Sequence, residues 1–193
     1  SILDHPKLYA SRRRRYSTQT ILIATALGAA IGIILVPVNF ALVGLTTTFP
    51  VIASISLGPW GMAALLPLAV LRRGGSGIIG GTAAGIVLVV SPGALLMVVV
   101  MAIWGMVMEI PFFVTRYRWF GWTMFTVVGV IAGVISCVAS IYTYNLPSMN
   151  AGLVTLICVA QISSFVVGSL LSLVISRALA RAGIAGGHRR VAR

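Results

Sequence analysis

The sequence has few charged residues and almost no acidic ones. Only 8% of its 193 residues are charged, and Asp and Glu together number two, whereas a soluble domain carries about 25% charged residues. A disordered chain would be poor in large aliphatic and aromatic residues, but 59% of this chain is hydrophobic. The composition therefore excludes both an ordinary soluble domain and a disordered tail.

Residues that carry chemistry are equally scarce. There is no Gly-x-x-x-x-Gly-Lys-Ser/Thr loop, so we expect no ATP hydrolysis by the P-loop route. The two histidines, His5 and His188, lie near opposite ends of the chain. We interpret Cys137 and Cys158 as packing residues rather than a disulfide or a ligand pair. We therefore expect no catalysis, no cofactor and no metal site.

Long apolar runs are the main feature that is present. The mean hydropathy is +1.08, and the runs reach the length of about 20 residues that spans a bilayer. Because backbone groups in lipid must be satisfied within their own segment, each run is expected to be a helix. We predict an all-α integral membrane protein with six transmembrane helices, over residues 18–38, 48–71, 76–90, 94–115, 120–144 and 151–180.

Two of these runs have a special composition. The second carries Pro50, Pro59 and Pro67, so we expect it to be broken or kinked. The third is short and rich in glycine, and it ends at Ser91-Pro92-Gly93.

The basic residues predict the orientation in the membrane. All 14 Lys and Arg residues lie in the two tails or in the connections after the second and fourth helices, and connections 39–47, 91–93 and 145–150 contain none. Because positive residues stay cytoplasmic, we place both termini in the cytoplasm and the protein in the cell membrane. The net charge of +12 then reflects topology, with some attraction to anionic lipid headgroups, rather than nucleic-acid binding.

The chain is thus divided into three parts. We predict a basic cytoplasmic tail over residues 1–17, a six-helix membrane domain over residues 18–182 and a second basic tail over residues 183–193. The first apolar run is long and has no small-residue cleavage site, so we expect a retained span rather than a cleaved signal peptide.

Glu109 is the one ionisable residue inside a predicted span. A carboxylate in the membrane costs on the order of 2.5–3.5 kcal/mol on insertion scales, so a role is expected for it. Its distance from Arg116 places it roughly 10 Å from the cytoplasmic end of the helix. A structural or coupling role is favoured, and substrate contact and proton transfer stay open.

Small residues at four-residue spacing recur in the helices. The first helix has Ala26 with Ala30 and Gly28 with Gly32, and rows also occur in the third helix (Gly77, Gly81, Gly85) and the fifth (Gly129, Gly133). Such rows let helix backbones approach closely in lipid. They indicate either packing inside the bundle or docking onto another membrane subunit, and the first helix is the best candidate for docking.

Polar and aromatic residues gather in the predicted outer half. A Trp N–H or a side-chain amide in the membrane needs a partner, and aromatic faces with a few amides and hydroxyls suit a flat heterocycle. The alternatives are interfacial positions for Tyr142 and Tyr144 and internal hydrogen bonds for the others. The candidate substrate-binding residues are Asn39, Ser54, Trp60, Trp104, Glu109, Tyr142 and Gln161.

Four stretches of the chain carry a family resemblance, through their order and spacing. They are Gly58-Pro59-Trp60 leading to Arg72-Arg73-Gly74-Gly75; Ser91-Pro92-Gly93; Trp104 to Glu109 with Thr115-Arg116-Tyr117-Arg118; and Arg177 to Ile184. In these stretches the chain resembles the substrate-binding (S) component of an energy-coupling factor (ECF) vitamin transporter. In particular it is similar to the YkoE family, which is assigned to thiamine or its hydroxymethylpyrimidine precursor.

The resemblance implies a non-catalytic subunit with defined partners. These are an EcfT-type transmembrane coupling subunit, two ABC ATPases or one fused ATPase, and a small vitamin, with Ala26, Ala30 and their neighbours facing the coupling subunit. Ser54, Gly81 and Ser140 stand where family members carry acidic residues. A buried thiazolium cation without a carboxylate is poorly compensated, so a neutral ligand such as a pyrimidine, or a different vitamin, is favoured.

Two other functions compete with this hypothesis. A structural or assembly subunit would use the glycine rows for packing alone and would have no ligand pocket. A stand-alone secondary transporter lacks support, because no carboxylate pair for ion coupling is present.

Overall fold

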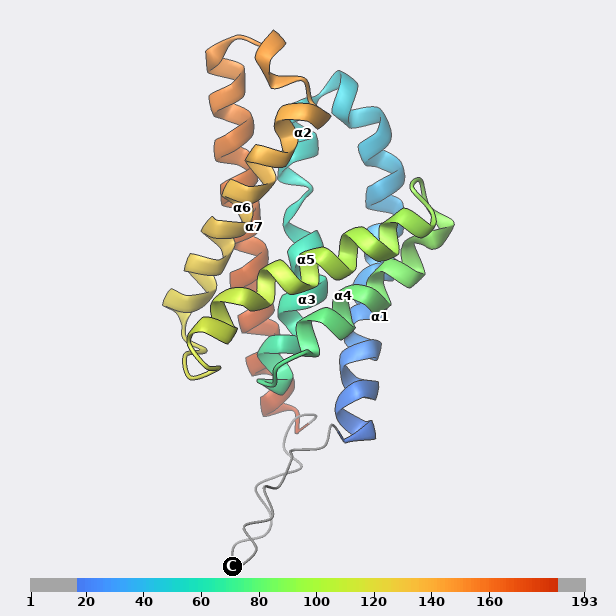
Figure 1. Cartoon of the computed structure of the whole chain (residues 1–193), viewed down its shortest axis with the longest axis vertical. Coiled ribbons are helices and arrows are strands. Elements are labelled where there is room, and N and C mark those ends of the chain that lie inside the picture. Colours follow the sequence, from blue (N-terminus) through green and yellow to red (C-terminus); the bar gives the residue numbers. More distant parts are fainter. Residues whose placement is uncertain (1–16, 184–193) are drawn as a thin grey trace, which may run out of the picture.

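The computed structural model describes residues 17–183, and these fold into helices with no strand among them (Figure 1). The predicted all-α class is confirmed. Residues 1–16 and 184–193, including His5, His188 and most of both predicted tails, lie outside the described residues. The helices are α1 (Thr18–Thr48), α2 (Pro50–Ile55), α3 (Gly58–Leu71), α4 (Ser76–Val87), α5 (Leu95–Val114), α6 (Trp122–Thr143) and α7 (Ala151–Arg181), with 3-10 turns at Leu88–Val90 and Leu146–Ser148.

Five helical stretches within residues 17–183 are long and apolar enough to cross a membrane. These are α1, α2 together with α3, α5, α6 and α7, and the segment Ser76–Val90 forms a shorter apolar helix. The six predicted segments therefore all occur, and the chain is a multi-pass membrane protein.

The predicted end of the first helix at Val38, with a connection over residues 39–47, is wrong. Helix α1 continues through Pro37 to Thr48, and Phe49 alone links it to α2. Proline is tolerated in a membrane helix where neighbouring groups satisfy the freed backbone. The buried Asn39 amide does not end the helix, because its Nδ2 donates to Ser91 Oγ (2.8 Å) and to the Pro92 carbonyl (2.9 Å).

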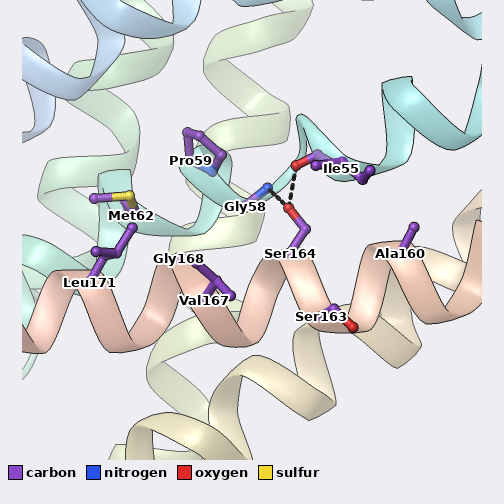
Figure 2. Close-up of a pocket in the computed structure, with 10 residues that line it drawn as sticks. All are labelled: Ile55, Gly58, Pro59, Met62, Ala160, Ser163, Ser164, Val167, Gly168 and Leu171. Atoms are coloured by element: carbon purple, nitrogen blue, oxygen red, sulfur yellow. Dashed lines mark hydrogen bonds between the residues drawn. The ribbon is translucent and has the colours of Figure 1, made fainter.

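The break predicted in the second helix is confirmed. Helix α2 ends at Ile55 and α3 begins at Gly58. The Gly58 N–H donates to Ser164 Oγ on α7 (2.7 Å), and that hydroxyl donates to the Ile55 carbonyl (Figure 2). Ser164 thus satisfies backbone groups on both sides of the break and holds it against α7.

The helices differ in direction. In Figure 1, α1, α3 and α7 run roughly along the long axis and α6 is tilted from it, whereas α4 and α5 lie side by side and cross the bundle obliquely. The start of α1 and the end of α7 lie at the same end of the bundle (Figure 1). The predicted topology, with both termini on the same side of the membrane, requires this arrangement. Which side of the membrane this end faces stays a prediction.

The glycine rows pack inside the bundle. A methyl group added at Gly28 would lie 2.1 Å from the Gly80 carbonyl oxygen, and one at Gly32 would lie 2.9 Å from the Ala84 Cα. On α6, Gly133 approaches Ile162 of α7 in the same way. Close backbone contact of this kind needs small residues, so the packing interpretation is confirmed for these rows.

Candidate functional site

A buried polar cluster lies between α2, α6 and α7. Gln161 is fully buried, with 0% exposure. Its Nε2 donates to Ser140 Oγ (2.7 Å) and, at 3.5 Å, to Ser54 Oγ. Ser54 also forms a side-chain hydrogen bond with Tyr144. We call Ser54, Ser140, Tyr144 and Gln161, which are all buried, the Gln161 cluster.

Gln161 of this cluster and Trp60 on α3 each have one buried atom with no hydrogen-bond partner within residues 17–183. Among the described residues, Trp60 Nε1 and Gln161 Oε1 are the buried side-chain nitrogen and oxygen atoms without a partner. Trp60 packs in the same apolar cluster as Tyr144 and Ile157, and Ile157 is one helical turn before Gln161. An unsatisfied buried group costs about 1–3 kcal/mol, and such groups are few in native proteins. The protein interior therefore holds one free donor on α3 and one free acceptor on α7.

The other predicted substrate-binding residues have different surroundings. Asn39 uses its amide to hold the turn at Ser91 and Pro92. Trp104 is half-buried and stacks on Phe165, with ring centroids 5.4 Å apart. Tyr142 is 90% exposed. The structure therefore brings together Ser54 and Gln161 from the predicted set and adds Ser140 and Tyr144. Trp60 is buried in the apolar cluster that also contains Tyr144.

Glu109 forms a separate site at the start of α4. Its carboxylate accepts hydrogen bonds from the Gly75 N–H, from the Ile78 N–H (3.3 Å) and from the Tyr117 hydroxyl (2.7 Å). A negative charge is stabilised by the free N–H groups at a helix N-terminus. These contacts tie α5 to the turn before α4 and to the turn after α5, and they support a structural role for Glu109.

Replacing Glu109 with glutamine should destabilise the fold. The new NH₂ group cannot accept a hydrogen bond, so at least one buried donor loses its partner, at a cost of about 2–3 kcal/mol. The apparent melting temperature in detergent should fall by roughly 4–12 °C. Thr123→Val, at an exposed position of α6, is the control. Equal melting temperatures for both variants would contradict the structural role.

A lateral groove lies between α7 and the α2–α3 break (Figure 2). It encloses about 450 Å³ and is almost wholly apolar, with two hydroxyls on its α7 side. It is lined by Ile55, Gly58, Pro59, Met62, Ala160, Ser163, Ser164, Val167, Gly168 and Leu171. None of the predicted site residues lines it. The backbones of Gly58 and Gly168 meet here, and these two glycines are the sequence signal that could have located this close crossing.

The metal-binding residue types do not cluster in the described part of the chain. Within residues 17–183, no group of three or more His, Cys, Asp or Glu residues comes together. Cys137 on α6 and Cys158 on α7 are both free, and their side chains contact each other across the helix pair.

The family follows from the sequence of the first two thirds of the molecule. Residues 19–135, more than half of the chain, match the protein family described as "ABC-type cobalt transport system, permease component". The chain belongs to this family. The matched segment extends from α1 into α6, so it contains Ser54, Trp60 and Glu109, whereas Ser140, Tyr144 and Gln161 lie beyond it.

A solved structure in the ECF class shares the fold of this family member. The crystal structure of an S-component of an ECF transporter superposes with a TM-score of 0.80 over 90% of both chains, at 17% sequence identity. At this identity the likeness shows the fold alone, and it confirms the expected S-component fold. No curated protein matches the sequence, and the YkoE-like subfamily stays a prediction.

Proposed function

We propose that this protein is the substrate-binding S component of an ECF-type importer of a small organic molecule. The observation that carries the proposal is the pair of unpartnered buried atoms, Trp60 Nε1 and Gln161 Oε1, in a chain with an S-component fold. The ligand accepts a hydrogen bond from the indole and donates one to the amide. Ser54 and Ser140 accept hydrogen bonds from the amide, and Tyr144 contacts Ser54.

The chemistry of the site favours an uncharged ligand. Its polar groups are an amide, two hydroxyls, a phenol and an indole, and none of these is charged at neutral pH. The carboxylate of Glu109 is occupied at the start of α4, so a buried cation such as thiazolium would lack a counter-charge. Divalent transition metals prefer imidazole, thiolate and carboxylate ligands. We therefore propose hydroxymethylpyrimidine, or a similar neutral heterocycle, as the cargo.

The proposed partners are an EcfT-type coupling subunit and two ABC ATPases or one fused ATPase. Gly28 and Gly32 are buried against α4, so they are not on the outer surface. Ala26 and Ala30 are exposed one helical turn apart on α1. The docking surface that we propose comprises Ala26 and Ala30, in a protein whose termini both face the cytoplasm.

Leucine at Ala26 or Ala30 should impair complex formation. The larger side chain prevents close approach of a partner helix and leaves the Gln161 cluster untouched. Co-purification with the coupling subunit should fall at least tenfold, whereas ligand binding by the isolated subunit should not change. Ala139→Leu, at an exposed position of α6, is the matched control. Normal co-purification of both α1 variants would refute this docking surface.

Native mass spectrometry of the protein purified from its own host tests the proposed function. A bound molecule of pyrimidine mass together with ATPase subunits would support both the importer and its cargo. ATPases with a bound molecule of another mass would support the importer and replace the cargo. A protein with neither would contradict the proposal and favour a structural or assembly subunit.

A further inference from the structure

The turn after α5 places two arginines beside each other. Arg116 and Tyr117 both adopt left-handed backbone conformations, with φ of 51° and 55°. Tyr117 donates its hydroxyl proton to Glu109 on α5, whereas Arg116 and Arg118, on either side of it, are exposed. Together with Val114, Thr115 and Trp119 they line a pocket of about 390 Å³.

Within residues 17–183, these two arginines have little counter-charge nearby. Residues 17–183 contain six arginines and a single carboxylate, that of Glu109, which accepts its hydrogen bonds from Gly75, Ile78 and Tyr117. Two other arginines stack on aromatic rings, Arg72 on Phe120 (5.4 Å) and Arg177 on Trp122 (4.8 Å). An anionic ligand is therefore the best source of negative charge for Arg116 and Arg118.

The apolar part of the pocket indicates what supplies that charge. Val114, the last residue of the spanning helix α5, is 73% exposed, and Trp119 is 68% exposed. Tryptophan is enriched at the membrane–water interface, and guanidinium groups pair bidentately with phosphate oxygens. An apolar wall directly beside two guanidinium groups, at the end of a spanning helix, matches a lipid with its phosphate above its acyl chains.

We propose that this pocket binds the headgroup of an anionic phospholipid. The phosphate pairs with Arg116 and Arg118, and the upper part of one acyl chain packs against Val114 and Trp119. The bound lipid holds the α5–α6 turn at the headgroup level. This site is independent of the Gln161 cluster and of the proposed cargo.

Lipid titration of the full chain in detergent, followed by native mass spectrometry, tests the proposal. Phosphatidylglycerol is the anionic probe and phosphatidylcholine the zwitterionic reference. An arginine near an anionic surface contributes about a fivefold gain in affinity, so Arg116→Gln/Arg118→Gln should bind phosphatidylglycerol about 25-fold more weakly. The control is Arg177→Gln/Arg181→Gln, which removes two charges from the last turns of α7 and should retain binding to within about fivefold.

Three results would overturn the proposal. An equal loss of phosphatidylglycerol affinity in the Arg177→Gln/Arg181→Gln control would show that binding depends on net charge and not on this pocket. Equal binding of phosphatidylglycerol and phosphatidylcholine by the unaltered protein would exclude headgroup recognition. Displacement of the lipid by millimolar glycerol phosphate would identify a site for a soluble phosphate. If the glutamine variant fails to fold, Arg116→Lys/Arg118→Lys keeps both charges and should still weaken binding, because lysine does not pair bidentately.

Discussion

Replacing Gln161 with leucine is expected to weaken the binding of hydroxymethylpyrimidine by about a hundredfold. The substitution removes the amide oxygen that we assign to the ligand and leaves Ser140 without its 2.7 Å hydrogen bond. Ser140 loses this bond with or without ligand, so that loss lowers stability and not affinity. The ligand loses its hydrogen bond and buries its donor without a partner, which costs about 2–3 kcal/mol and corresponds to a factor of roughly 30 to 150 in affinity. Titration of the purified protein by isothermal calorimetry measures the change.

Trp60→Phe provides an independent test of the same site. It keeps an aromatic ring but removes the five-membered ring with its N–H, which has no partner in the protein, so affinity should fall at least about tenfold. Because Trp60 is buried in the core, the smaller ring also leaves a cavity and the melting temperature should fall as well. The control is Ser163→Ala, because Ser163 is exposed on the same helix as Gln161 and faces the lateral groove. Unchanged affinity in both the Gln161 and Trp60 variants would remove the Gln161 cluster from the binding site.

Gly28→Ala adds a single methyl group and should strongly destabilise the protein. The new Cβ would lie 2.1 Å from the Gly80 carbonyl oxygen and 2.6 Å from the Gly80 Cα. Both obstructing atoms belong to the backbone, so α1 and α4 must move apart along their contact. Overpacking of this kind costs about 3 kcal/mol or more, and the apparent melting temperature should fall by roughly 6–12 °C.

Gly44→Ala is the matched control for this prediction. It lies on the same helix, but nothing is within 4 Å of the position that its Cβ would occupy. Alanine also favours a helix over glycine by about 1 kcal/mol, so this variant should melt at the original temperature or slightly above it. A Gly28→Ala protein as stable as Gly44→Ala would show that the α1–α4 contact is not close.

Much of the architecture could be predicted from local features of the sequence. Run lengths and prolines identified the six apolar segments and the interruption of the second, because a bilayer imposes length and internal hydrogen bonding on every span. The end of the first helix could not be found in this way. Pro37 and Asn39 resemble stop signals, and only the contact of Asn39 with Ser91 and Pro92 explains why α1 continues.

The candidate site was predicted only in part. Trp60, Gln161 and Ser54 stood out as polar or amphipathic groups in apolar runs, since such groups need partners in lipid. Ser140 was noted only as the replacement of an acidic residue, and serine is common in helices that pack closely. Tyr142 and Tyr144 look alike in the sequence, yet Tyr144 joins the cluster and Tyr142 is exposed. Residues two positions apart at a helix end point to different sides, because an α-helix has 3.6 residues per turn.

By itself, the sequence determined that this chain is a helical membrane protein and where its apolar segments lie, because hydropathy and charge act locally along the chain. The tertiary structure decided which small residues meet, that Glu109 contacts the start of α4, and which two buried side-chain atoms within residues 17–183 have no partner. Those facts depend on side chains from helices far apart in sequence, and their pairing is fixed only when the helices pack.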